Sequence, residues 1–181
     1  MGERVVLVGM MGAGKSTVAR LVAARLGCPF VDTDTEIVRA EGASVAEIFA
    51  RRGEDHFRAA ESRALEAVAR RAGPLVVSVG GGAVVDEENR RRLRAMGTVV
   101  WLRARPETLA RRLSDGDDRP LLAGARGSQV LERLRRLETQ RRGLYEEVAD
   151  RIVDVDDLRA ADVVERLLAE ADPAAGSSST P

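Results

Sequence analysis

The chain carries the run Gly9-Met10-Met11-Gly12-Ala13-Gly14-Lys15-Ser16, which matches the pattern Gly-x-x-x-x-Gly-Lys-Ser of a phosphate-binding P-loop. The apolar residues 4–8 before it are typical of a buried parallel strand. After it, residues 16–26 place apolar side chains at helical spacing, and Gly27 is suited to end that helix. A strand, a glycine-rich loop and a helix in this order are the context that the motif requires. The run therefore predicts an α/β fold that binds a nucleoside triphosphate.

Lys15 is the only lysine of the chain, and the other 28 of its 29 basic residues are arginines. An ammonium on a flexible stem can lie along the loop and reach the β- and γ-phosphates, whereas a guanidinium is wider and suits flat bidentate partners. Gly12 and Gly14 let backbone N–H groups turn toward a polyphosphate at the start of a helix. The Ser16 hydroxyl is suited to Mg²⁺. The alternative is a glycine-rich turn that merely precedes a helix.

The composition is that of an ordinary globular protein, with 181 residues, 44% of them hydrophobic and 32% charged. We expect one domain over residues 1–171. A formal net charge of zero and the lack of a membrane-length apolar stretch predict no nucleic-acid or membrane partner. Cys28 alone excludes an internal disulfide, and one cysteine with one histidine cannot form a zinc site. The first strand begins too early for a signal peptide, so we expect a cytoplasmic enzyme that acts as a monomer.

Four further segments resemble strands, and helical patterns separate them. The strands are expected at Phe30-Val31, Leu75–Val79, Thr98–Leu102 and Arg151–Val155. The helices include a short one opened by the capping box Ser44–Glu47, then Phe57–Arg70, one capped by Asp86 and running to Met96, one starting at Pro106, and Asp162–Glu170. This repeated order predicts a three-layer α/β sandwich, with a five-stranded parallel sheet and helices on both faces.

Two segments do not fit this alternation of strands and helices. Residues 114–127 are polar and rich in glycine, and their length favours a lid or a binding loop, with a plain surface insertion as the alternative. Residues 172–181 are rich in Pro, Ala, Gly and Ser, which predicts a disordered tail.

Asp32-Thr33-Asp34 follows the second strand, at the edge where open parallel sheets bind their ligands. In an extended stretch Asp32 and Asp34 share one face. Two carboxylates beside a phosphate site suit two tasks, one near Mg²⁺ and one on an acceptor hydroxyl. The alternative for Asp34 is a helix cap, since a helix is expected to start near Thr35.

With these residues the sequence resembles the shikimate kinases, small P-loop enzymes related to nucleoside monophosphate kinases. The resemblance is collinear over about residues 4–170. It rests on Gly9–Thr17, Asp32-Thr33-Asp34, Phe57-Arg58-x-x-Glu61, Gly80-Gly81-Gly82-Ala83-Val84, Arg119-Pro120-Leu121-Leu122 and Arg141-x-x-x-Tyr145. It implies a P-loop kinase fold and transfer of a phosphoryl group from ATP, with Mg²⁺, to the 3-hydroxyl of shikimate. That reaction is a step toward chorismate and the aromatic amino acids.

The resemblance also implies a role for each matched residue. The phosphates of ATP are held by Gly12, Ala13, Gly14, Lys15, Ser16 and Thr17. Arg119 is the lid arginine that closes over ATP, and Arg112 stacks on adenine or lies on a helix surface. Shikimate is bound by Asp34, Arg58, Gly80, Gly81, Gly82 and Arg141. Mg²⁺ is held by Ser16 and Asp32, where Asp32 replaces the acid that many P-loop proteins carry at the position of Ser78. The implied catalytic residues are Lys15, Asp34 and Arg119.

Several alternatives stay open at this point. Arg142 competes with Arg141 for the role in substrate binding, and Glu61 is expected to hold Arg58 through an i,i+3 pair. Arg90-Arg91-Arg92 and Arg94 are expected on a solvated helix face, and Trp101 in the core. Unlike many shikimate kinases, the segment after the last strand lacks a proline, and Arg159 is displaced, so the adenine contacts are not predicted.

Two other functions compete with shikimate phosphorylation. A kinase of another small polyol acid, such as gluconate, would share the P-loop but has less use for Asp34, Arg58 and three successive glycines. A nucleotide-binding switch without catalysis would need a partner surface or an effector domain, which this length does not offer.

Overall fold

The computed structural model describes residues 4–113, 120–122, 124 and 127–169. Five strands form one sheet in the order β2-β3-β1-β4-β5, and every neighbouring pair is parallel. The strands are β1 (Arg4–Val8), β2 (Phe30–Asp32), β3 (Leu75–Ser78), β4 (Thr98–Arg103) and β5 (Arg151–Asp154). Each predicted strand agrees with the structure to within one residue at either end. The prediction of a five-stranded parallel sheet is confirmed.

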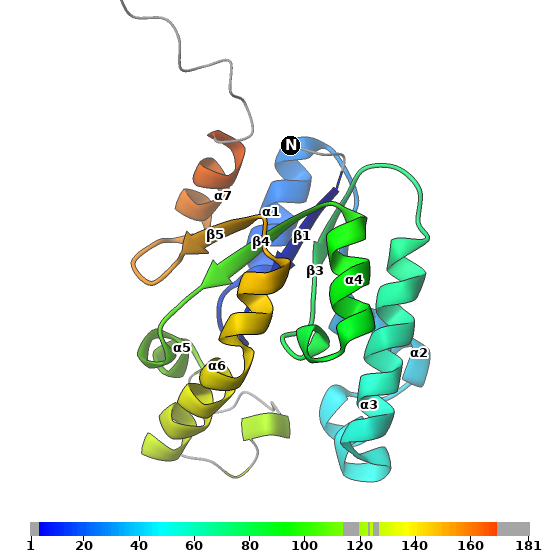
Figure 1. Ribbon diagram of the computed structural model, residues 1–181, viewed down its shortest axis with the longest axis vertical. Helices are drawn as coiled ribbons and strands as arrows, with labels where there is room; N and C mark the ends of the chain where they lie inside the picture. The colour runs from blue at the N-terminus through cyan, green and yellow to red at the C-terminus, as the bar shows by residue number, and fades with distance from the viewer. Residues whose placement is uncertain (1–3, 114–119, 123, 125–126, 170–181) are drawn as a thin grey trace, which may run out of the picture.

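Helices cover both faces of this sheet (Figure 1). On one face α1 packs beside α7, and on the other α4 and α6 lie against β4, with α3 next to α4. The helices are α1 (Lys15–Leu26), α2 (Thr33–Glu41), α3 (Val45–Ala69), α4 (Glu87–Met96), α5 (Pro106–Arg112), α6 (Ser128–Val148) and α7 (Ala160–Ala169), with short 3₁₀ turns η1 (Ala83–Val85) and η2 (Pro120–Leu122). The three-layer arrangement is therefore the one expected from the sequence.

The helix ends form for the local reasons read from the sequence. Gly27 ends α1 in the left-handed conformation at φ 64°, and Pro106 is the first residue of α5. Ser44 and Glu47 form a reciprocal capping box, while Asp86 caps α4 by accepting from the Asn89 amide at 2.8 Å. These short-range contacts fix where the helices begin without help from the tertiary fold.

The prediction of two separate helices between residues 45 and 69 agrees with the backbone. The span labelled α3 consists of two helical parts that meet at a kink at Gly53, whose φ of 82° and ψ of 173° lie outside helical values. The Glu41 carboxylate at the end of α2 accepts bonds from Arg52 before this break, at 2.5 Å, and from His56 after it, at 2.9 Å. The hydrogen bond from His56 and the charges of His56 and Arg52 lower the pKa of Glu41. The Glu41 carboxylate thus links both parts of α3 to the end of α2.

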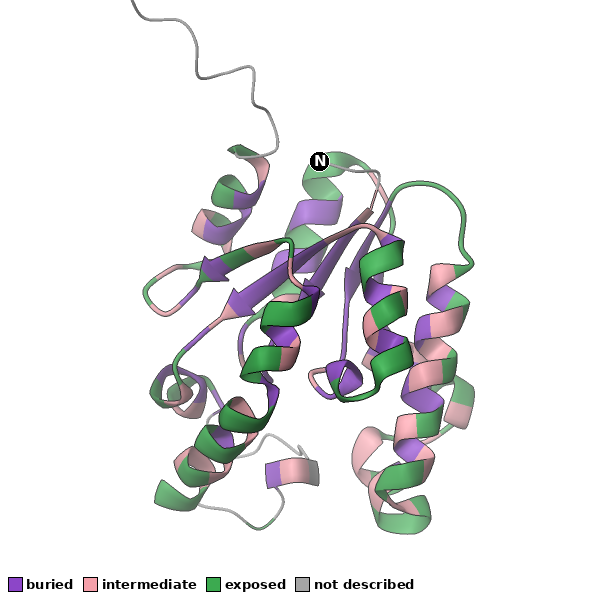
Figure 2. Ribbon diagram, in the orientation of Figure 1, coloured by how far each residue is buried: buried purple, intermediate pink, exposed green. Residues whose placement is uncertain are grey.

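The core lies on both sides of the central strands β1, β3 and β4, in which every residue is buried except Arg4, Thr98 and Arg103 at strand ends (Figure 2). Trp101 is among these residues, as predicted, and its ring stacks on Tyr145 with centroids 5.4 Å apart. The expectation of a fully solvated arginine face on α4 is wrong for Arg90, because its side chain is largely buried and donates to the Val84 carbonyl at 2.9 Å. No helix within the described part of the chain is long and apolar enough to cross a bilayer.

Several predictions lie outside the described residues. They concern Arg119, most of the proposed lid (114–119, 123 and 125–126), and the tail at 172–181.

Candidate active site

The loop between β1 and α1 has the backbone of a phosphate cradle. Gly12 and Gly14 adopt positive φ angles of 80° and 89°, which side chains other than glycine rarely tolerate. Gly14 is also the N-cap of α1, so no side chain occupies the backbone N–H groups of the first helical turn. Those groups and the positive end of the helix dipole face the space beyond the loop, which makes this position suited to an anion.

Lys15 lies at the first position of α1 and reaches back over the loop. Its Nζ donates a hydrogen bond to the Met10 carbonyl at 2.9 Å. The same side chain lines a pocket beside the loop, together with Met11. The ammonium therefore lies between the phosphate loop and the neighbouring pocket, as transfer of a phosphoryl group between the two requires.

Three oxygen-bearing side chains meet beside the loop. The Ser16 hydroxyl donates to Asp32 Oδ2 at 2.5 Å and lies 3.2 Å from the Ser78 hydroxyl. The other oxygen of Asp32 caps α2 by accepting from the amides of Asp34 at 3.0 Å and Thr35 at 3.4 Å. The helix cap considered for Asp34 is thus supplied by Asp32, and Asp34 lines the pocket beside the loop.

This group of oxygens fits Mg²⁺, which prefers hard oxygen ligands and keeps several waters. Among the described residues there is no cluster of three or more Asp, Glu, His and Cys side chains that could enclose a metal ion. A cation held by Ser16 and Asp32 would therefore take its remaining ligands from water and from phosphate, as Mg²⁺ does in kinases.

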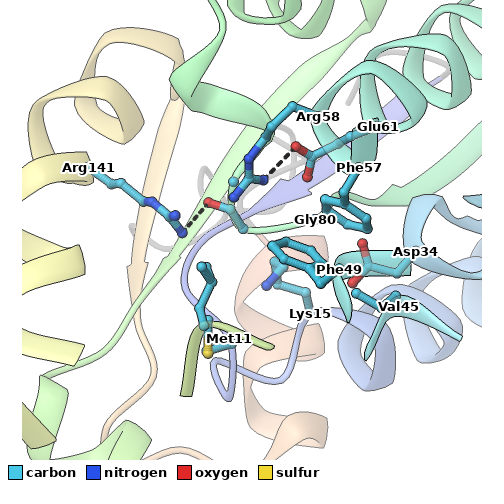
Figure 3. Close-up of a pocket in the computed structure, with 13 residues that line it drawn as sticks. Met11, Lys15, Asp34, Val45, Phe49, Phe57, Arg58, Glu61, Gly80 and Arg141 are labelled. Atoms are coloured by element: carbon cyan, nitrogen blue, oxygen red, sulfur yellow. Dashed lines mark hydrogen bonds and ion pairs between the residues drawn. The ribbon is translucent and has the colours of Figure 1, made fainter. Parts of the chain in front are cut away.

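A pocket adjoins the loop on the side of α2 and α3. Figure 3 shows side chains from segments that are far apart in the sequence around it, with Lys15, Asp34, Arg58 and Arg141 all in its wall. The residues that line it are Met11, Lys15, Asp34, Val45, Phe49, Phe57, Arg58, Glu61, Gly80, Gly81, Gly82, Leu121 and Arg141. Every described residue expected to bind the acceptor is in this list.

Arg58 is held between two carboxylates of α3. Its Nη1 donates to Glu61 at 2.8 Å, and its Nη2 donates to Glu54 at 2.9 Å. Burial disfavours the charge on Arg58, but both glutamates favour it more and raise its pKa. The predicted i,i+3 pair of Arg58 with Glu61 is confirmed as a contact, and Glu54 is a second partner that sequence reasoning did not find.

The glycine run after β3 is needed for close approach. A Cβ atom on Gly80 would lie 2.6 Å from Glu61 Oε1 and 2.7 Å from Asp34 Oδ1, and one on Gly82 would collide with the Arg58 guanidinium. The Gly80 amide also donates to the Thr33 hydroxyl at 2.9 Å. Here the missing side chains give room to the polar groups of the site itself, a reason beyond the expected contact with substrate.

Arg141 comes to this site from α6 and is almost fully buried. Its Nη1 donates to the Gly81 carbonyl at 3.2 Å, and the Tyr145 hydroxyl donates to the same carbonyl at 2.6 Å. Its neighbour Arg142 is exposed and pairs with Glu138 and Glu146 on the outer face of α6. The structure therefore favours Arg141 over Arg142 as the arginine of the pocket.

Two aromatic residues of the pocket were not found by sequence reasoning. Phe49 and Phe57 flank the Gly53 break of α3, and their rings pack with centroids 4.7 Å apart. Both lie in runs whose apolar residues have helical spacing, where a core position and a pocket position look alike. The signal that could have found them is scarcity, since the chain has only three phenylalanines.

Arg112 is tied to the loop after β5. Its Nη2 donates to the carbonyls of Val155 at 2.5 Å and Asp156 at 3.3 Å. The segment lacks the family's proline, and Arg159 bonds Asp162 at the start of α7 instead. The guanidinium of Arg112 thus fixes the backbone at the edge where adenine was expected, and stacking on a base stays a prediction.

Comparison with known proteins identifies the family. The family model described as shikimate kinase matches residues 11–172. The shikimate kinase of Rhizobium meliloti (strain 1021) is 44% identical over 170 residues, which cover 93% of this chain and 86% of that protein. The solved shikimate kinase of Acinetobacter baumannii in complex with shikimate superposes with a TM-score of 0.87 at 37% identity, covering 93% of this chain and 92% of that one.

A more distant neighbour bears on the competing function. A gluconokinase from Sinorhizobium meliloti 1021 superposes with a TM-score of 0.58 at 25% identity, covering 92% of this chain and 89% of that one. Both the identity and the superposition are well below those of the shikimate kinases. The chain therefore belongs to the shikimate kinase family.

Proposed function

We propose that this chain transfers the γ-phosphoryl group of ATP to the 3-hydroxyl of shikimate, in the pathway toward aromatic amino acids. One observation carries the proposal. Lys15 of the phosphate loop lines the same pocket as Asp34, Arg58 and Arg141. A nucleotide on the loop and a small acid in the pocket would then face each other across the Lys15 ammonium.

The acceptor has one carboxylate and several ring hydroxyls, and the pocket has a matching group for each. Arg58 and Arg141 supply guanidinium groups that bind a carboxylate with good geometry. Asp34 supplies a carboxylate for the attacking hydroxyl, from which it accepts a hydrogen bond and then the proton. Phe49 and Phe57 supply apolar surface for the ring and exclude water from it.

Phosphoryl transfer depends mostly on positioning and on stabilising negative charge. The backbone amides of Gly12–Thr17 bind the phosphates, and the Lys15 ammonium balances charge on the group in transit. Ser16 and Asp32 would hold Mg²⁺, which when bound neutralises charge on the phosphate oxygens. Arg119 would add a further positive charge from the lid. That the protein works as a cytoplasmic monomer without nucleic-acid or membrane partners stays a prediction.

A coupled assay with purified protein, ATP, Mg²⁺ and a panel of acceptors tests the proposal. We expect ATP turnover that requires shikimate, and little turnover with gluconate or quinate. Turnover that is independent of any acceptor would overturn the proposal, and turnover with gluconate alone would reassign the substrate. Calorimetry separates a binding-only switch, which would bind ATP but give no heat with shikimate.

A further inference from the structure

Glu61 is a carboxyl group enclosed in the wall of the acceptor pocket. Its side chain is only 2% exposed, although it belongs to one of the most strongly hydrated residue types. Its Oε2 accepts from Arg58 at 2.8 Å. The same guanidinium turns outward to Glu54, whose side chain is 53% exposed. Arg58 thus donates hydrogen bonds to two carboxylates, that of the buried Glu61 and that of the exposed Glu54.

A second carboxylate lies close to the buried one. Oε1 of Glu61 and Oδ1 of Asp34 both approach the point where a Cβ of Gly80 would sit, so the two oxygens are at most about 5.3 Å apart. At that separation inside a pocket, each negative charge disfavours the other. Arg58 is the cation in direct hydrogen-bond contact with Glu61, so the charge on Glu61 depends on that guanidinium.

The other charged and titratable groups come from three further elements. Arg141 and Tyr145 face Glu61 from α6, and Lys15 lines the same pocket from the phosphate loop. Asp86, the N-cap of α4, lines a second pocket together with Glu61. Burial raises the pKa of Glu61 to about 7, against the lowering effect of Arg58 and with a further raise from Asp34.

Binding of the acceptor adds a negatively charged carboxylate to the pocket, close to Glu61. If the proposed function holds, the carboxylate of shikimate approaches Arg58 and Arg141 and competes with Glu61 for the Arg58 guanidinium. It also displaces water from the pocket, which disfavours a charged Glu61 further. We infer that Glu61 takes up a proton from solvent when the acceptor binds, and that acceptor binding is therefore coupled to pH.

The sign of the effect follows from linkage between binding and protonation. Uptake of a proton means that the affinity for shikimate falls as pH rises, by at most about tenfold per pH unit. Well below pH 7 Glu61 already carries the proton, so the affinity levels off there. Near pH 7 about half of the free molecules are protonated, and we expect uptake of about half a proton per acceptor bound.

Titration calorimetry of the full chain with shikimate, at pH 7.5 in HEPES and in Tris, measures this uptake. The two buffers release protons with different enthalpies, so proton uptake appears as a difference in the observed heat. We expect such a difference for the unaltered protein, and a dissociation constant that rises several-fold between pH 6.5 and 8.5. The measurement needs no variant and no nucleotide.

The substitution Glu61→Gln keeps the size of the side chain and an oxygen that can accept from Arg58, but it cannot titrate. We expect the same heat in both buffers and a pH-independent dissociation constant. Glu54→Gln is the matched control, since it alters the exposed partner of Arg58. It should retain the difference in binding heat between HEPES and Tris.

The possible outcomes separate this inference from the proposed function. Binding with equal heats in both buffers would overturn proton uptake but leave shikimate as the acceptor. A loss of affinity in Glu61→Gln that is equal at every pH would mean that Glu61 only holds Arg58 in place. Absence of any heat with shikimate would overturn the proposed function and this inference together.

Discussion

The phosphate loop and the acceptor pocket share a wall, yet they are built in different ways. The loop takes its shape from eight consecutive residues, with glycines at positive φ and a helix start that no side chain caps. The pocket is assembled from α2, α3, the glycine run after β3, η2 and α6. One site is a local backbone conformation, and the other exists only when distant segments have packed.

The two sites also handle charge differently. The loop offers N–H groups and one ammonium, while the pocket balances two arginines against buried or half-buried carboxylates. Buried pairs of this kind are costly to break, because removal of one partner leaves the other charge without compensation. The pocket should therefore respond strongly and selectively to changes in its side chains.

The largest expected effect is that of Lys15→Met. It removes the ammonium but keeps an unbranched apolar stem, so transfer should fall by about 10³-fold or more while the fold is retained. Steady-state turnover measures the loss of transfer, and thermal unfolding shows whether the fold is retained. Lys15→Arg is the sharper control, since it keeps the charge and adds width. Activity restored by arginine would show that charge alone matters at this position.

The difference between the loop and the pocket also explains which features could be predicted from the sequence. The loop, the strands and most helix ends depend on contacts within a few residues, so glycine, proline and capping patterns determine them. Residues 128–148 form a long helix that these patterns did not delimit, because it starts after Gly127 without a capping side chain. The kink at Gly53 falls between the two helices that were predicted, but the residue at which it occurs was not, since an isolated glycine is tolerated inside a helix.

Apart from Asp34, which its place after the second strand indicated, the residues of the pocket were predicted only through resemblance. The residues Asp34, Arg58 and Arg141 are scattered along the chain, and no spacing rule brings them together. The roles of Tyr145 and Glu54 depend on which neighbour each side chain meets after folding. For the same reason the bond of Arg112 to the Val155 carbonyl could not be foreseen.

A second prediction tests whether the pocket acts independently of the loop. Arg58→Ala should weaken shikimate binding by about 10²-fold, because it removes a charged contact and leaves Glu61 without its cation. ATP binding should change less than about threefold, since the hydrogen bonds of Arg58 go to Glu54 and Glu61 on its own helix. Calorimetry with each ligand separately gives both values.

Arg142→Ala is the control for this second prediction, because it removes an exposed arginine whose partners lie on the outer face of α6. It should leave both affinities unchanged. Equal losses for the two ligands in Arg58→Ala would instead place Arg58 outside the acceptor site and remove the contrast between the two regions.

A third and smaller effect concerns the space left by the glycine run. Gly80→Ala would push a methyl group against Glu61 and Asp34, whose flexible ends must move away. We expect shikimate binding to weaken by about tenfold, in line with the usual cost of overpacking. Gly143→Ala is the matched control, because this α6 glycine has open space around it and should gain about 0.5 kcal/mol in stability. Unchanged shikimate affinity in Gly80→Ala would mean that binding does not depend on the positions of the Glu61 and Asp34 carboxylates.

The smallest effect tests how far the pocket depends on remote support. Tyr145→Phe keeps the ring that stacks on Trp101 and removes only the hydroxyl that donates to the Gly81 carbonyl at 2.6 Å. Arg141 still donates to that carbonyl, so the free energy of unfolding should fall by only about 1 kcal/mol. Urea unfolding measures this loss. Shikimate affinity should fall with it, since one of the two hydrogen bonds described between α6 and the Gly81 carbonyl is lost. ATP affinity should stay constant, because the phosphate loop is shaped by its own backbone. A loss of ATP affinity as large as that of shikimate would show that the two sites are supported as one unit.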